Sequence, residues 1–160
     1  MAEITAAQVW QEIEKQSFAV LGMVTAKGAS RTVGILYTVR NHRLYIASNC
    51  DMWKTRHIAQ NGQVSLTIPI TKRIPFLPWI KIPAATLTFA GTAKVHKLAD
   101  VDTEIRDALL RGQASDSDFA SKLCVIDVMP QGNFVTYGVG IPLIQMNDKK
   151  KARGRVAVAM

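Results

Sequence analysis

The sequence has few cysteines and no long apolar run, and both shortages narrow the classes of protein that it encodes. Of its 160 residues only Cys50 and Cys124 are cysteines, too few for a disulfide framework. No run of about 18 uncharged apolar residues occurs, so no membrane-spanning helix is predicted. The start, MAEITAAQVWQEIEKQ, carries acids and amphipathic spacing instead of a basic and then apolar segment. We therefore expect no signal peptide, a reducing compartment and a cytoplasmic location.

Several signatures of catalytic and metal sites are also missing. The sequence has no Gly-x-Ser-x-Gly elbow, no Gly-x-Gly-x-x-Gly fingerprint and no phosphate loop of the GxxxxGK type. Its three histidines, His42, His57 and His96, lie far apart and lack cysteine or carboxylate neighbours at metal-ligand spacing. The sequence therefore predicts no metal site.

The composition is that of an ordinary globular protein, with 48% hydrophobic and 20% charged residues, and we expect one domain over residues 1–160. The net charge of +8 is unevenly spread. Basic residues crowd into the C-terminal segment: Lys149, Lys150, Lys151, Arg153 and Arg155. Such a cluster is typical of a surface for nucleic acid, anionic membrane or a phosphate-bearing ligand, and equally of a solvated tail.

The hydrophobic pattern predicts many short strands and few helices. A capping box of Thr5 and Gln8 begins a helix that ends near Gln16. Strands are expected at 17–25, 30–39, 44–48, 63–70, 85–98, 124–130 and 133–141, and further helices at 52–60 and 100–111. Because hairpins rather than helices join most strands, the pattern favours an antiparallel barrel or sandwich with peripheral helices.

Residues 69–83, PITKRIPFLPWIKIP, combine four prolines and three cations with large apolar side chains. Because proline donates no amide hydrogen bond, this segment is excluded from the centre of a sheet. It is expected to be a loop, flap or edge segment. Two interpretations stay open: a cover over a ligand or dimer contact, or a rigid surface excursion.

Small polar and cationic residues gather where the strand at 44–48 gives way to the helix at 52–60. A helix N-terminus offers unpaired amides and a dipole that favours an anion. Ser48 and Asn49 add hydrogen-bonding groups, and Lys54 adds a positive charge. Arg31, on a strand expected to lie beside 44–48, would supply a second cation suited to phosphate. The corner is therefore a candidate anion site.

Simpler interpretations of the same corner stay open. Ser48 or Asp51 would cap the helix, and Lys54 and Arg56 would be solvated. Cys50, beside a helix start and two cations, would either have a lowered pKa or fill space at the turn.

The run GMVTAKGASRTVGILYTVRNHRLYIASNCDMWKTRHIAQNGQVSLTI resembles the core of the FMN-binding split β-barrel family related to pyridoxamine 5'-phosphate oxidase. A weaker resemblance continues through Thr86–Val95 and 124–130, so it covers most of the chain. It implies a mainly β (α+β) fold, a split antiparallel β-barrel with a few peripheral helices. Members of this family usually dimerise with the cofactor between the subunits.

The resemblance also implies a set of cofactor-binding residues: Arg31, Thr32, Val33, Gly34, Ala47, Ser48, Asn49, Trp53 and Lys54. Arg31 and Lys54 fall on the family's phosphate-contacting positions, and the backbone from Thr32 to Gly34 on the strand along the flavin ring. Two positions depart from the family pattern, because Met52 stands where serine is frequent and Trp53 where arginine is frequent. An indole at Trp53 would stack on a ring or bond one oxygen instead.

The resemblance thus implies a homodimeric FMN-dependent oxidoreductase that acts on a small-molecule redox substrate, with no nucleic-acid or membrane partner. Dimerisation would bury Phe76, Trp79 and Ile80. The residues that hold pyridoxamine phosphate in the true oxidase are not recognisable, so that reaction is not expected, and no catalytic residue is predicted.

Two other hypotheses remain. The same cleft would suit a non-catalytic protein that binds deazaflavin F420 or haem, with His57 or His96 as an iron ligand. A nucleic-acid-binding barrel, with bases stacked on Tyr37 and Tyr45, ranks last because basic and aromatic residues do not alternate along the strands.

Overall fold

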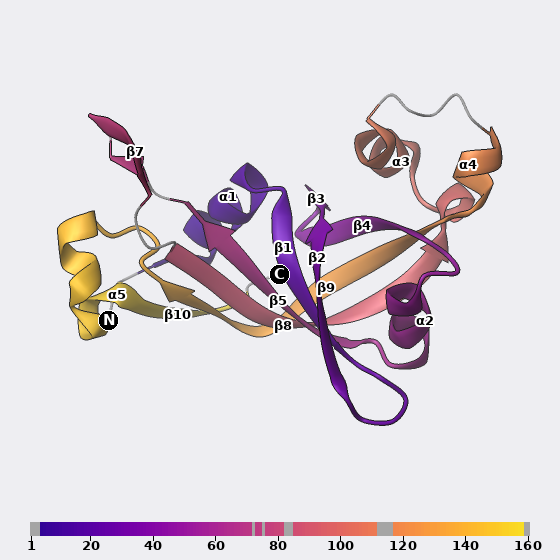
Figure 1. Cartoon of the computed structure of the whole chain (residues 1–160), viewed down its shortest axis with the longest axis horizontal. Coiled ribbons are helices and arrows are strands. Elements are labelled where there is room, and N and C mark those ends of the chain that lie inside the picture. Colours follow the sequence, from indigo (N-terminus) through magenta and orange to yellow (C-terminus); the bar gives the residue numbers. More distant parts are fainter. Residues whose placement is uncertain (1–3, 72, 75, 82–84, 112–116, 159–160) are drawn as a thin grey trace.

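The structure, a computed structural model, describes residues 4–71, 73–74, 76–81, 85–111 and 117–158. Most of the described chain forms one antiparallel sheet with the strand order β2-β1-β5-β8-β9-β4-β3, and β10 pairs with β9 as well (Figure 1). The strands are β1 (Phe18–Val24), β2 (Ser30–Leu36), β3 (Thr38–Arg40), β4 (Arg43–Asn49), β5 (Gln63–Ile70), β8 (Ala85–Lys97), β9 (Leu123–Tyr137) and β10 (Arg153–Ala157).

The sheet curls because its two edge strands are consecutive in the chain. β2 and β3 lie at opposite ends of the strand order, yet only Tyr37 separates Leu36 from Thr38. The two edges must therefore approach each other at Tyr37, which is buried and donates its hydroxyl to the carbonyl of Ile13 at 2.8 Å. The result is a half-barrel with a few helices, and the predicted mainly β (α+β) fold is confirmed.

The helices lie around this half-barrel. They are α1 (Ala6–Lys15), α2 (Trp53–Gln60), α3 (Thr103–Leu110), α4 (Ser117–Ser121) and α5 (Lys149–Ala152), with 3-10 turns η1 (Leu98–Asp100) and η2 (Leu143–Asn147). The capping box of Thr5 and Gln8 is confirmed at the start of α1. From α1, Val9, Trp10 and Ile13 are buried in the barrel core. A second, smaller core beneath α3 contains Tyr45, Leu98, Ile105, Leu110 and Val125.

Two expectations about strands are wrong, and one strand was missed. The run at 30–39 divides at Tyr37, so Arg31 pairs with Met23 of β1 and does not lie beside β4. The two strands expected at 124–130 and 133–141 are one strand, β9, because a bulge absorbs Gly132, whose φ is 71°. At this bulge, two residues of β8, from Ala90 to Thr88, span the same length of the ladder as four residues of β9. β10 was not predicted.

The proline-rich segment contributes a separate two-stranded sheet of β6 (Arg73–Ile74) and β7 (Leu77–Lys81). It projects from the half-barrel between the end of β5 and the start of β8 (Figure 1). The expected exclusion from the main sheet holds for the described hairpin but not for Pro69 and Ile70, which end β5 opposite Thr86 and Ala85 of β8. Proline is tolerated there because β1 pairs with β5 only from Val64 to Thr67, so Pro69 has no ladder partner on that side.

A charged pair joins β4 to β9. The Arg43 Nε and Nη2 atoms donate to the two Asp127 carboxylate oxygens, each at 2.8 Å, and Asp127 is only 8% exposed. This bond raises the pKa of the Arg43 guanidinium. We predict that Asp127→Asn, which keeps the shape but removes the charge, lowers the free energy of unfolding by roughly 1–3 kcal/mol. Urea denaturation measures it, with Asp107→Asn, exposed on α3, as the control. Equal stability of the two variants contradicts the prediction.

Candidate functional site

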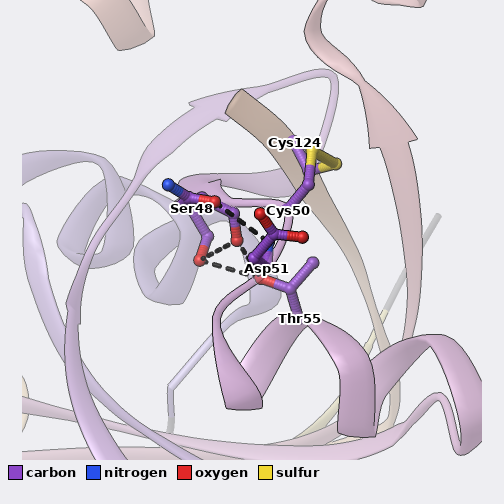
Figure 2. The surroundings of a disulfide bond; sticks show 6 residues. Ser48, Cys50, Asp51, Thr55 and Cys124 are labelled. Atoms are coloured by element: carbon purple, nitrogen blue, oxygen red, sulfur yellow. Dashed lines mark hydrogen bonds between the residues drawn. A yellow bond between two sulfur atoms is a disulfide. The ribbon is translucent and has the colours of Figure 1, made fainter. Parts of the chain in front are cut away.

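The corner between β4 and α2 is held by its own hydroxyls. The Thr55 hydroxyl lies 2.9 Å from both the Ser48 hydroxyl and the Asn49 carbonyl oxygen, so its one proton is shared between these two acceptors (Figure 2). The Asn49 side-chain oxygen accepts from the Asp51 amide at 2.9 Å. Ser48 is buried, so its hydroxyl fixes the turn, and its predicted contact with a cofactor remains a prediction.

The two cysteines form a disulfide between Cys50 and Cys124, which Figure 2 shows beside this turn. The bond is possible because β4 and β9 are neighbours and Ser48 lies opposite Cys124 in their register. Both earlier interpretations of Cys50, a thiol with a lowered pKa and a space filler, are therefore wrong. The cysteine count also stops being an argument for a reducing compartment, so the cytoplasmic location stays a prediction.

The first amides of α2 are not capped by a side chain. The N-cap residue is Met52, which makes no side-chain cap bond, so the expected cap by Ser48 or Asp51 is wrong. The positive end of this helix therefore stays available to an anion.

A cavity of about 330 Å³ opens at the seam where the two edges of the sheet meet. Its floor comes from the end of β2 and the start of β3, one wall from β4, and the others from α2 and the end of α3. The lining residues are Gly34, Ile35, Leu36, Tyr37, Thr38, Ile46, Ala47, Lys54, Ala108, Leu109 and Arg111. The size is at the lower end of the range for small-molecule sites.

The cavity surface is partly apolar and carries two cations. Lys54 is half-buried near the start of α2, and Arg111 follows the last residue of α3. Ile35, Ile46 and Leu109 supply apolar wall. Two positive side chains and a helix N-terminus beside apolar surface suit a ligand with a flat apolar body and an anionic end.

Tyr37 lies at the floor of this cavity but is a poor candidate for a base. Burial raises the pKa of its phenol well above the ordinary value, and the hydroxyl already donates to a backbone carbonyl. The phenol therefore stays protonated at neutral pH, and its ring serves as wall.

Sequence reasoning missed the contribution of α3. Arg111 sits in the left-handed region, with φ 44°, and its amide donates to the Asp107 carbonyl at 3.0 Å. An arginine at a helix C-terminus is an ordinary complement to the helix dipole, so the sequence gives no sign of a binding role.

The structure brings some of the predicted residues together and leaves others apart. Gly34, Ala47 and Lys54 line the cavity at the seam. Arg31 and Thr32 instead line a separate hollow, formed between β2, β1 and β5. The cavity therefore joins Lys54 to Arg111 and not to Arg31, and a cofactor role for Arg31 and Thr32 stays a prediction.

Four further predicted positions lie outside the cavity lining: Ser48 and Asn49, which belong to the corner described above, and Val33 and Trp53. A cofactor contact of Asn49 stays a prediction. Val33 is half-buried and packs against the barrel core. Trp53 is partly exposed. Its indole packs edge to face against the His57 ring, with ring centroids 6.0 Å apart. Stacking of Trp53 on a cofactor ring remains a prediction.

The histidines contact different groups. His42 stacks on Trp10 with ring centroids 4.7 Å apart, and His96 Nε2 lies 3.6 Å from an Asp127 carboxylate oxygen. Among the described residues no three metal-ligating side chains come together. Nor is any helix in those ranges long and apolar enough to cross a bilayer.

Comparison with known proteins gives the fold but no family. No family model matches the chain, and no curated protein matches its sequence. Solved structures do match. A candidate pyridoxamine 5'-phosphate oxidase from Listeria innocua has a TM-score of 0.59 at 17% identity, over 78% of this chain and 92% of that one.

Two further structures are similar over a larger share of the chain. A haem-binding protein from Mycobacterium smegmatis has a TM-score of 0.68 at 15% identity, over 99% of this chain and 60% of that one. An F420 reductase has a TM-score of 0.55 at 15% identity, over 84% of this chain and 98% of that one. The chain therefore has the split-barrel fold of the pyridoxamine 5'-phosphate oxidase-like proteins.

Proposed function

We propose that this chain is a flavoprotein that binds FMN non-covalently at the seam cavity and acts as an oxidoreductase on a small molecule. The observation that carries the proposal is the joining of Lys54 and Arg111 in one partly apolar cavity of a split barrel. One of the similar structures is named for F420, which supports a flavin-type ligand without choosing among flavins.

The lining residues fit FMN in two parts. Lys54, Arg111 and the uncapped amides of α2 would hold the phosphate. The apolar side chains and the backbone near Gly34 would lie along the ring. Bound FMN would supply the transfer of electrons, and the protein would orient it and exclude water.

We also propose that the active form is a homodimer, with the cofactor at the subunit interface. Leu36 lines the cavity and is 60% exposed, and Phe18, directly opposite on β1, is 44% exposed. These neighbours form apolar surface at the mouth of the cavity, which a second copy would cover. Light scattering measures the mass of the protein in solution and so distinguishes a dimer from a monomer.

A second candidate is a haem-binding protein. His96 lies 3.6 Å from the Asp127 carboxylate, and an iron-ligating histidine usually has such an acceptor for its other ring nitrogen. The similarity to a haem-binding structure agrees with this alternative. His57 is the other histidine that would ligate iron.

Titration of the purified protein separates the candidates. With FMN we expect a perturbed flavin spectrum and saturable binding at micromolar concentrations. With haemin, a Soret band that is lost in His96→Ala or His57→Ala but kept in His42→Ala favours the second candidate. F420 is titrated in parallel, and preferred binding of F420 would replace FMN as the cofactor. If no flavin binds, the proposal is wrong.

A further inference from the structure

The hairpin of β6 and β7 exposes large apolar side chains that the proposed FMN site does not use. Phe76, in the turn, is 89% exposed, and Trp79 on β7 is 73% exposed. Leu77 is also exposed and lies on the same side of β7 as Trp79, two residues away. Exposed aromatic residues on a projecting hairpin indicate a surface that contacts an apolar partner.

The base of this hairpin lies at the same end of the sheet as the basic C-terminal segment. β5 ends at Ile70 opposite Ala85, and the neighbouring row runs from Thr86 of β8 to Tyr137 of β9 and on to Arg153 of β10. In Figure 1, β7 and α5 occupy one end of the long axis, and α3 and α4 occupy the other. The hairpin and α5 therefore lie at the same end of the half-barrel.

Basic residues occur at the base of the hairpin and on α5. In the hairpin, Arg73 of β6 and Lys81 of β7 lie opposite each other in the backbone register, at the end away from the turn. On α5, Lys149 and Lys150 are exposed and form no ion pair with any residue that the structure describes, whereas Lys151 lies 3.9 Å from Asp148. Ile144 on the preceding turn η2 is 91% exposed and adds apolar surface.

We propose that this end of the molecule docks on an anionic lipid bilayer, with Phe76, Leu77 and Trp79 in the interface and the cations over the headgroups. Tryptophan favours the boundary between headgroups and acyl chains, and nearby lysines and arginines are attracted to anionic lipid. Such peripheral docking needs no spanning helix. It departs from the expectation of no membrane partner.

A second copy of the chain is the less favourable occupant. Pairing this end with itself would bring two basic surfaces together in a protein whose net charge is +8. The apolar neighbours Phe18 and Leu36 lie on other strands and remain free for the proposed dimer. Docking on lipid thus leaves the seam cavity and its dimer contact unchanged, and the two proposals can fail separately.

The test is flotation of the full chain with vesicles of phosphatidylcholine mixed with phosphatidylglycerol, against vesicles of phosphatidylcholine alone. We expect the mixed vesicles to bind at least about tenfold more tightly, and binding to weaken with salt. Phe76→Ser with Trp79→Ser should lower binding by about tenfold or more. Phe119→Ser, which changes a half-exposed aromatic residue on α4, is the matched control and should bind as the wild type.

A second variant tests the electrostatic part. Each of Lys149→Gln and Lys150→Gln should weaken binding to the mixed vesicles about fivefold. The proposal is overturned if the wild type binds neither kind of vesicle, or if the hairpin variant binds as tightly as the wild type. It is overturned as well if the wild type is a dimer that binds no vesicles and the hairpin variant is a monomer, because a second copy then occupies the hairpin surface.

Discussion

Replacing Lys54 by alanine is expected to weaken FMN binding by about 10- to 150-fold. The replacement removes one charge-assisted hydrogen bond to the phosphate, which contributes roughly 1.5–3 kcal/mol. Arg111→Ala should have an effect of the same size, because the two cations line the same cavity. The double variant should lose still more. Fluorescence titration of FMN measures the dissociation constants.

Arg56→Ala is the matched control for these variants. Arg56 lies on the same helix as Lys54, is exposed and does not line the cavity. It should reduce affinity only slightly, through the long-range loss of one charge. Arg31→Ala tests the other predicted phosphate contact, and since Arg31 lines a different hollow, we expect a smaller loss than for Lys54→Ala. Equal losses for Arg56→Ala and Lys54→Ala would remove Lys54 from the site.

Loss of the disulfide is expected to be the largest single change in stability. The bond closes a loop with a sequence separation of 74 residues. A cross-link of this span constrains the unfolded chain, and we expect replacement of both cysteines by serine to cost about 2–4 kcal/mol. For a chain of this size that corresponds to a fall in the melting temperature of roughly 5–15 °C. Calorimetry measures it.

A dithiol reductant supplies the control for the disulfide. It should lower the melting temperature of the wild type and leave that of the double serine variant unchanged. Mass measurement after alkylation should find no free thiol in the untreated protein. A wild type that alkylates at both cysteines without unfolding, or that melts at the same temperature with reductant, contradicts the assignment.

The strands were predictable because their period and turns are local. The hairpin between β3 and β4, for example, turns through Asn41 and His42, both with positive φ, and the sequence indicates it correctly. Division of the run at 30–39 was not predictable. It depends on Tyr37 bonding to α1 and joining two sheet edges, which is a property of the closed barrel.

The candidate site was predictable in part for the same reason. Lys54 lies seven positions after Ala47, and a strand-to-helix corner places them together without knowledge of the rest of the fold. The second cation of the cavity was not predictable. Arg111 follows α3, and the position of α3 is set by the packing of Ile105 and Leu110 on β4 and β9. Pairing of Cys50 with Cys124 likewise required the strand order.

The most direct test of the central claim compares FMN with riboflavin, which lacks the phosphate, on the wild type and on the double variant Lys54→Ala, Arg111→Ala. The account predicts that the wild type prefers FMN by more than about tenfold, and that the double variant binds the two flavins about equally. A wild type that binds neither flavin, or binds both equally well, would contradict a phosphate site at the seam.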